Sequence, residues 1–169
     1  MNIVASNILR FVIVLTVQVV LINHLHLSAL LTPLLYIWCL LLLPVKLPRR
    51  LELFVGFVTG LLMDICCNTL GLQAFSCTLI AFIRPYILRS TVPDWERLLS
   101  TPTMNEIGWG AYLKTIIPLT LLHHTIVIFL QNFSFAGIVY TIANILLSSV
   151  VVIFAMIVCD LLLYRPKSA

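Results

Sequence analysis

Residues 137–164 read GIVYTIANILLSSVVVIFAMIVCDLLLY, an apolar run in which Asp160 is the one charged side chain. A transmembrane helix needs about 20 consecutive, predominantly apolar residues to cross the hydrocarbon core of a bilayer. This stretch meets that length, so it predicts a membrane-spanning helix.

The composition of the whole chain agrees with this segment. Of the 169 residues, 62% are hydrophobic and 9% are charged, whereas a soluble globular domain has about 45–50% apolar and about 25% charged residues. Such a composition excludes a typical soluble enzyme. The net charge of +4 does not indicate a nucleic-acid partner, because the basic residues are scattered and form no patch.

Six apolar segments in the chain predict an all-α integral membrane protein. The links after the first, third and fifth segments are short, and those after the second and fourth are longer and polar, which indicates three hairpins in series. We therefore expect residues 1–169 to form a single transmembrane domain. The expected spans are approximately 8–22, 27–43, 51–65, 70–88, 112–130 and 137–164.

Arg10 followed by the apolar residues 11–22 resembles the basic and hydrophobic regions of a signal peptide, but no small-x-small cleavage site follows, so we expect a retained helix.

The basic residues predict the orientation of these spans. All ten Lys and Arg residues lie in, or within about a turn of, the N-terminus, the second link, the fourth link or the C-terminus. Cytoplasmic segments carry the excess of Lys and Arg in membrane proteins, so both termini are expected to be cytoplasmic. The ten are Arg10, Lys46, Arg49, Arg50, Arg84, Arg89, Arg97, Lys114, Arg165 and Lys167.

The third segment carries the densest signal for a packing or partner-interaction site. Gly56, Gly60 and Asp64 are spaced by four residues, so they form one stripe about 12 Å long on a helix. Glycines at this spacing allow another helix to approach closely, most often one of the same chain. An acid at the end of such a stripe should face protein or water. Gly71, in the following turn, suits a close contact or an unusual backbone angle.

The fourth link is expected to contain a short helix over residues 91–99. Trp95, Leu98 and Leu99 would share one side of it, which suits a helix lying at the cytoplasmic membrane interface. The alternative is a docking surface for a cytoplasmic partner.

Other polar residues are expected to serve the structure. Gln18, Asn144, Ser148 and Ser149 should form hydrogen bonds between helices. His123 and His124 point about 100° apart on a helix, so they cannot share one metal ion.

Two acids are expected to form ion pairs at the membrane interface, Glu52 with Arg49 or Arg50, and Asp160 with Arg165. The chain has no G-x-S-x-G, H-E-x-x-H or Walker motif. We therefore expect no catalytic residues, metal or cofactor, and no enzymatic activity.

The stretch from Leu51 to Phe82 resembles the signature region of the rod shape-determining MreD family. That family shows G-x-x-x-G-L-L-x-D, a short turn, then L-G and an apolar helix. Chain length and the six-span layout are also similar. The residues that carry the resemblance are Gly56, Gly60-Leu61-Leu62-x-Asp64, Leu70-Gly71-Leu72 and Ala81.

The resemblance implies a non-enzymatic scaffold subunit of the bacterial cell-elongation complex, in the cytoplasmic (inner) membrane. Such a subunit would bind the single transmembrane helix of an MreC-like protein. Together they would couple the MreB filament to RodA and its class B penicillin-binding partner, which build peptidoglycan.

The family is also similar in fold to the substrate-binding (S-component) subunits of energy-coupling-factor vitamin transporters, which supply the alternative function. Those subunits carry A-x-x-x-A in the first helix, whereas here Ala5 is followed four residues later by Leu9. The outer half of the chain also lacks an evident rich polar set for a vitamin pocket. Both observations favour the scaffold.

Overall fold

The computed structural model describes residues 11–20, 31–95, 98, 101–132 and 137–163. Every regular element in these residues is a helix, which confirms the all-α class. A helix at Phe11–Val20 is followed by α2 (Ile37–Leu41), α3 (Arg49–Cys67), α4 (Leu72–Thr91), α5 (Met104–Ile107), α6 (Trp109–Asn132) and α7 (Ile138–Leu163).

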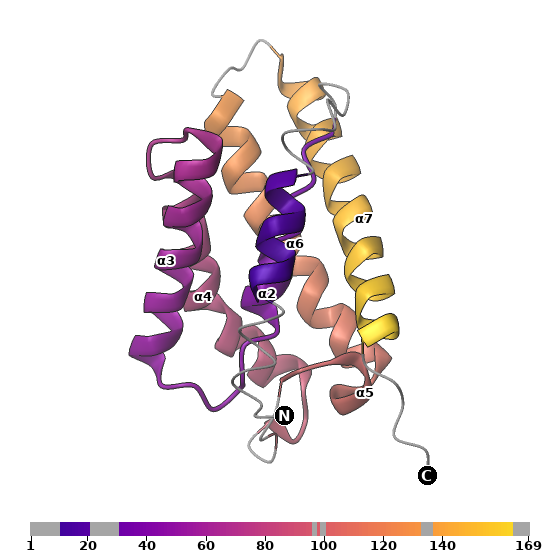
Figure 1. The fold of residues 1–169 in the computed structure, drawn as a ribbon. Helices are drawn as coiled ribbons and strands as arrows, with labels where there is room; N and C mark the ends of the chain where they lie inside the picture. The colour runs from indigo at the N-terminus through magenta and orange to yellow at the C-terminus, as the bar shows by residue number, and fades with distance from the viewer. Residues whose placement is uncertain (1–10, 21–30, 96–97, 99–100, 133–136, 164–169) are drawn as a thin grey trace.

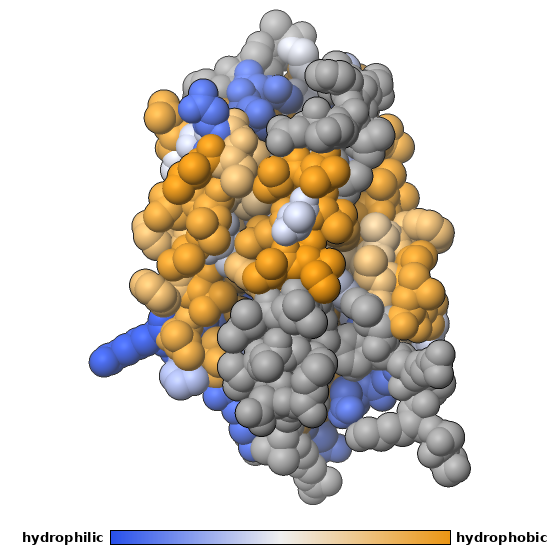
Figure 2. All heavy atoms as spheres, viewed as in Figure 1, coloured by the Kyte–Doolittle hydropathy of each residue, from blue (hydrophilic) through white to orange (hydrophobic). Residues whose placement is uncertain are grey.

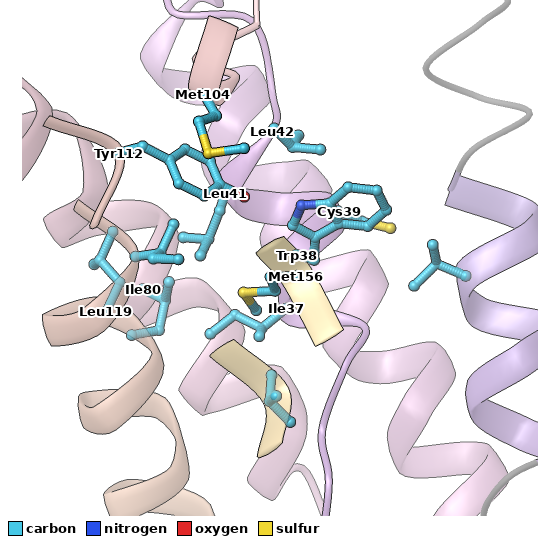
Figure 3. Close-up of a cluster of buried hydrophobic side chains, with 13 residues drawn as sticks. Ile37, Trp38, Cys39, Leu41, Leu42, Ile80, Met104, Tyr112, Leu119 and Met156 are labelled. Carbon is cyan, nitrogen blue, oxygen red and sulfur yellow. The ribbon is translucent and has the colours of Figure 1, made fainter. Parts of the chain in front are cut away.

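The four long helices form a bundle in which neighbours in sequence are neighbours in space. α3 packs mainly on α4, α4 also packs on α6, and α6 packs on α7, while the short α2 contacts α4 and α6 from inside the bundle (Figure 1). All five residues of α2 are buried. Figure 3 shows Ile37, Trp38 and Leu41 of α2 packed against Ile80, Leu119 and Met156 of the surrounding long helices.

The start of α3, the end of α4 and the start of α6 lie at one end of the bundle, which we call the basic end (lower end in Figure 1). A hydrogen bond from Arg84 to Glu52 joins α4 to the first turn of α3. Thr91, at the end of α4, shares a hydrogen bond with Thr115 near the start of α6. Six basic residues therefore gather toward this end, namely Lys46, Arg49, Arg50, Arg84, Arg89 and Lys114.

Two of the described helices, α6 and α7, are long and apolar enough to cross a membrane. The surface between the two ends of the bundle is largely apolar, with hydrophilic residues toward the ends (Figure 2). Large side chains such as Phe54 and Ile65 on α3 and Leu146 and Phe154 on α7 are exposed. Soluble monomers rarely expose contiguous apolar surface on this scale.

The segment expected to be a helix over residues 27–43 is different in its described part. Residues 31–34 are not helical, a turn follows, and only Ile37–Leu41 is helical. Pro33 explains the break, because it lacks an N–H donor and disfavours the helical conformation at Thr32. Hydropathy alone therefore overestimated this helix. We call residues 31–36 the irregular segment.

Side chains from other helices satisfy the backbone of the irregular segment. The Gln18 amide donates to the Pro33 carbonyl (2.8 Å) and accepts from the Leu35 amide (2.7 Å). Ser148 of α7 accepts from the Thr32 amide (2.9 Å) and donates to Asn144 (2.9 Å). Gln18 and Ser148, which were expected to join helix to helix, thus hold a partly buried stretch of non-helical backbone that needs these partners. The buried hydroxyl of Ser149, also expected to form such a bond, has no hydrogen-bond partner among the described residues.

The segment expected to be a helix over residues 91–99 is also different in its described part, which leaves out residues 96, 97 and 99. Thr91 belongs to α4, and Val92 is extended, as a residue before proline prefers. Trp95 and Leu98 form one turn, in which the Leu98 amide donates to the Trp95 carbonyl (3.2 Å). Leu99 lies outside the described residues. The short helix in this link is α5, which begins at Met104, thirteen residues after the end of α4. The Met104 amide donates a hydrogen bond to the Asp160 carboxylate of α7 (2.7 Å).

Candidate functional site: the α3–α4 hairpin

The glycine stripe of α3 faces α4. A Cβ built on Gly56 would lie 2.8 Å from the Ala81 Cβ and 3.0 Å from the Cys77 carbonyl oxygen. A Cβ built on Gly60 would lie 2.6 Å from the Ala74 nitrogen, and closer still to the Ala74 Cα and the Gln73 carbonyl oxygen. The stripe is therefore a packing seam inside the chain, and both glycines are buried in it.

Asp64 caps the first turn of α4 from the neighbouring helix. Its Oδ1 accepts hydrogen bonds from the Thr69 hydroxyl (2.5 Å) and the Gln73 amide (2.9 Å), and its Oδ2 accepts one from the Ala74 amide (2.9 Å). The first N–H groups of a helix have no partner within the helix, and a carboxylate there also complements the helix dipole. Asp64 is only 4% exposed, so its carboxylate is surrounded by these donors and not by water.

The turn between the two helices depends on two left-handed residues. Asn68 ends α3 with φ 54°, and its amide donates to the Asp64 carbonyl. Gly71 precedes α4 with φ 81°, and a Cβ at Gly71 would meet nothing within 4 Å. Of the two roles considered for Gly71, the structure therefore shows the unusual backbone angle and no close contact. Asn and Gly are the residues that adopt this conformation at least cost.

A buried ion pair closes the hairpin at the basic end. Arg84 donates to Glu52 (2.7 Å), to the Leu41 carbonyl (3.1 Å) and to the Leu43 carbonyl. Its side chain is 2% exposed. Arg49 is one of the two partners expected for Glu52. Its Nη1 lies 3.9 Å from Glu52 Oε2, so it is a more distant partner than Arg84. Arg84 thus also satisfies carbonyl groups that the end of α2 leaves without helical partners.

A second polar cluster lies beside the other end of the hairpin. The Tyr36 hydroxyl, at the start of α2, donates to the side-chain oxygen of Gln73 and is 2.9 Å from His123 Nε2. Cys77 lies 3.9 Å from the same nitrogen. The half of the bundle that contains the α3–α4 turn is therefore richer in buried polar side chains than its sequence suggests.

The neighbouring His124 has a different role from His123. Its Nδ1 lies 2.9 Å from the Thr120 carbonyl, and its Nε2 lies 3.5 Å from the Leu34 amide of the irregular segment. The two imidazoles thus serve separate neighbours. Within the described residues, no group of three or more His, Cys, Asp or Glu side chains is placed to hold a metal ion.

Sequence reasoning identified the residues of the seam and the turn but missed two others. Arg84 enters the sequence-based prediction only as one of the ten basic residues that indicate the orientation. A charged residue within an apolar helix also indicates that a partner of opposite charge lies close to it inside the protein. Tyr36 gave no signal, because its partners Gln73 and His123 lie on other helices.

No family model, curated protein or solved structure matches the chain.

Proposed function

We propose that the chain is a six-span protein of the bacterial inner membrane with both termini in the cytoplasm. Two helices of spanning length, α6 and α7, and the apolar surface support this placement. α3 and α4 carry charged side chains, which disfavour a membrane-spanning helix, but these charges have partners inside the protein. Glu52 pairs with Arg84, and Asp64 caps the first turn of α4. The basic end would face the cytoplasm, following the positive-inside rule.

The second crossing in this proposal consists of the irregular segment and α2. Non-helical backbone at membrane depth is tolerated only where protein or water surrounds it. The side chains of Gln18 and Ser148, which hydrogen-bond to the backbone of this crossing, are the protein partners that it needs.

Its function would be that of a non-enzymatic scaffold subunit of the cell-elongation complex, similar to MreD. The observation that carries this proposal is that the G-x-x-x-G-L-L-x-D motif acts as one structural unit. Gly56 and Gly60 form the seam, and Asp64 locks the same hairpin at its turn. A hairpin fixed at several points presents a constant surface to a partner, which is what a scaffold requires.

The partner in this proposal is the single transmembrane helix of an MreC-like protein, through which MreB, RodA and the class B penicillin-binding protein would be linked. The face of α3 opposite the seam is apolar and exposed, so it is available to such a helix. Its large side chains are Leu51, Phe54, Phe57, Leu61, Leu62 and Ile65.

Co-purification from mild detergent tests the scaffold. We expect a tagged chain to retain a one-span MreC-like protein, and Phe54→Ala with Ile65→Ala to weaken retention without lowering the thermal midpoint. The matched control is Leu146→Ala, which shortens an equally exposed apolar side chain on α7. Absence of a one-span partner from the wild-type eluate would contradict the scaffold function.

The alternative, a substrate-binding subunit of an energy-coupling-factor transporter, is favoured by one observation. Tyr36, Gln73 and His123 form a buried polar cluster next to the irregular segment, and broken segments near the middle of a membrane often form transporter sites. Retention of an ATPase module in place of the one-span protein would select this function.

A further inference from the structure

A cavity of about 330 Å³ lies at the basic end, between the start of α3, the end of α4 and the turn at Trp95. Its wall contains three arginines, from two helices, and one acid. The polar and aromatic residues that line it are Arg49, Glu52, Arg84, Tyr86, Arg89 and Trp95.

The charges around this cavity do not cancel. Arg84 is fully engaged by Glu52 and by the Leu41 and Leu43 carbonyl oxygens, so this pair is neutral and committed to the fold. The remaining charges in the lining are the two guanidinium groups of Arg49 and Arg89. Glu52, the one acid of the lining, lies 2.7 Å from Arg84 and also 3.9 Å from Arg49, so three arginines and one acid leave the lining with a net formal charge of +2.

Both guanidinium groups are held by aromatic rings. The Arg49 guanidinium carbon lies 4.7 Å from the centre of the Phe82 ring and 5.3 Å from that of Tyr86, and Arg89 lies 4.5 Å from the centre of the Trp95 ring. Ring contacts occupy the face of a guanidinium and leave its in-plane N–H donors available for carboxylate or phosphate oxygens. Arg49 uses one donor on the Phe82 carbonyl (2.5 Å).

We propose that this cavity binds a phosphate ester, supplied by the headgroup of an anionic phospholipid in the leaflet at the basic end. Arginine recognises phosphate oxygens through paired N–H donors, and basic pockets on the cytoplasmic side of membrane proteins bind anionic headgroups. Val45, Leu47 and Leu88 complete the lining with apolar surface, which suits the glycerol and upper acyl chains of a lipid better than a free phosphate. The site rests on the membrane placement proposed above.

Binding can be measured by native mass spectrometry of the intact protein released from nanodiscs that contain phosphatidylglycerol and phosphatidylcholine. We expect preferential retention of phosphatidylglycerol, reduced about fivefold by Arg49→Gln and about fivefold by Arg89→Gln. The matched control is Arg50→Gln, which removes the adjacent charge from α3 but does not alter the cavity lining. Because Arg89 is exposed and its guanidinium stacks on the half-buried Trp95 ring, its variant should keep the wild-type thermal midpoint.

Three results would overturn the proposal. An equal loss with Arg50→Gln would indicate general surface charge, and equal retention of both lipids would indicate no headgroup site. Displacement of the lipid by an acidic peptide, with the same dependence on Arg49 and Arg89, would assign the cavity to a protein partner instead.

Competition with glycerol 1-phosphate separates the two sources of phosphate. No displacement at millimolar concentration supports the lipid, whereas displacement that depends on Arg49 and Arg89 keeps the phosphate site and overturns the lipid as its source. Failure of the chain to enter nanodiscs would refute the membrane placement as well, while entry without lipid preference would refute this site alone.

Discussion

Gly60→Ala is the smallest change that should disturb the hairpin. The added Cβ would lie 2.6 Å from the Ala74 nitrogen and closer to the Ala74 Cα and the Gln73 carbonyl oxygen. All three are backbone atoms in the first turn of α4, so no rotamer change relieves the overlap and α4 must move. Overpacking costs about 1–3 kcal/mol, and the movement also stretches the hydrogen bonds from Gln73 and Ala74 to Asp64.

Thermal unfolding in mild detergent, followed by tryptophan fluorescence, measures this cost. For a chain of this size, 1 kcal/mol corresponds to about 2–4 °C in the midpoint, so we expect Gly60→Ala to lower the midpoint by roughly 2–12 °C. Val58→Leu enlarges a half-buried side chain of α3 away from the seam, and it should change the midpoint by less than about 2 °C.

Two double variants make the test specific. The nearest atom to a Cβ at Gly56 is the Ala81 Cβ, at 2.8 Å, so Ala81→Gly should restore much of the stability lost in Gly56→Ala. Ala74→Gly should not restore Gly60→Ala, because the obstructing atoms there are backbone. A wild-type midpoint for Gly60→Ala, or its rescue by Ala74→Gly, would refute the close approach of α3 and α4.

Three further predictions concern polar groups. Asp64→Asn replaces one acceptor oxygen by a donor that faces the amide of Gln73 or Ala74, so it should lower the stability by about 1–3 kcal/mol. Asp64→Leu should lower it further. The thermal midpoints of both variants, with cell width measured at equal protein level, show whether this order holds. Gln18→Leu leaves the Pro33 carbonyl and the Leu35 amide without their side-chain partner, so it should destabilise by about 2 kcal/mol or more, and a midpoint equal to wild type would contradict this role. Cys66 is exposed and Cys67 is half-buried, so in intact spheroplasts a membrane-impermeant maleimide should label the wild type rapidly and Cys66→Ser slowly; rapid labelling only after lysis would reverse the proposed orientation.

The sequence was sufficient for the long helices and for the residues of the hairpin. α3, α4, α6 and α7 begin and end within a few residues of the expected segments, because apolar runs bounded by Asn, Gly and Pro leave little choice. The spacing of Gly56, Gly60 and Asp64 placed them on one stripe, and helical geometry keeps such residues on one face whatever the tertiary structure.

The sequence was insufficient wherever the partner of a residue lies on a distant helix. Hydropathy cannot distinguish a buried helix from a buried irregular segment, since both are apolar, and the hydrogen bond from Thr32 to Ser148 joins positions 116 residues apart. Glu52 was assigned its neighbours in sequence, whereas its main partner Arg84 comes from the adjoining helix. Such pairings depend on how the helices pack, which local patterns do not contain.

The irregular segment also has a consequence for the order of assembly. Its backbone partners belong to the N-terminal helix, α6 and α7, through Gln18, His124 and Ser148. Each unpaired backbone group in hydrocarbon costs several kcal/mol, so in the proposed membrane placement residues 31–36 cannot settle in lipid when they first leave the ribosome. They must remain in a protein-lined or aqueous environment until α7, which follows the other described helices in chain order, has been synthesised. The second crossing in sequence would thus be completed only after α7 is in place.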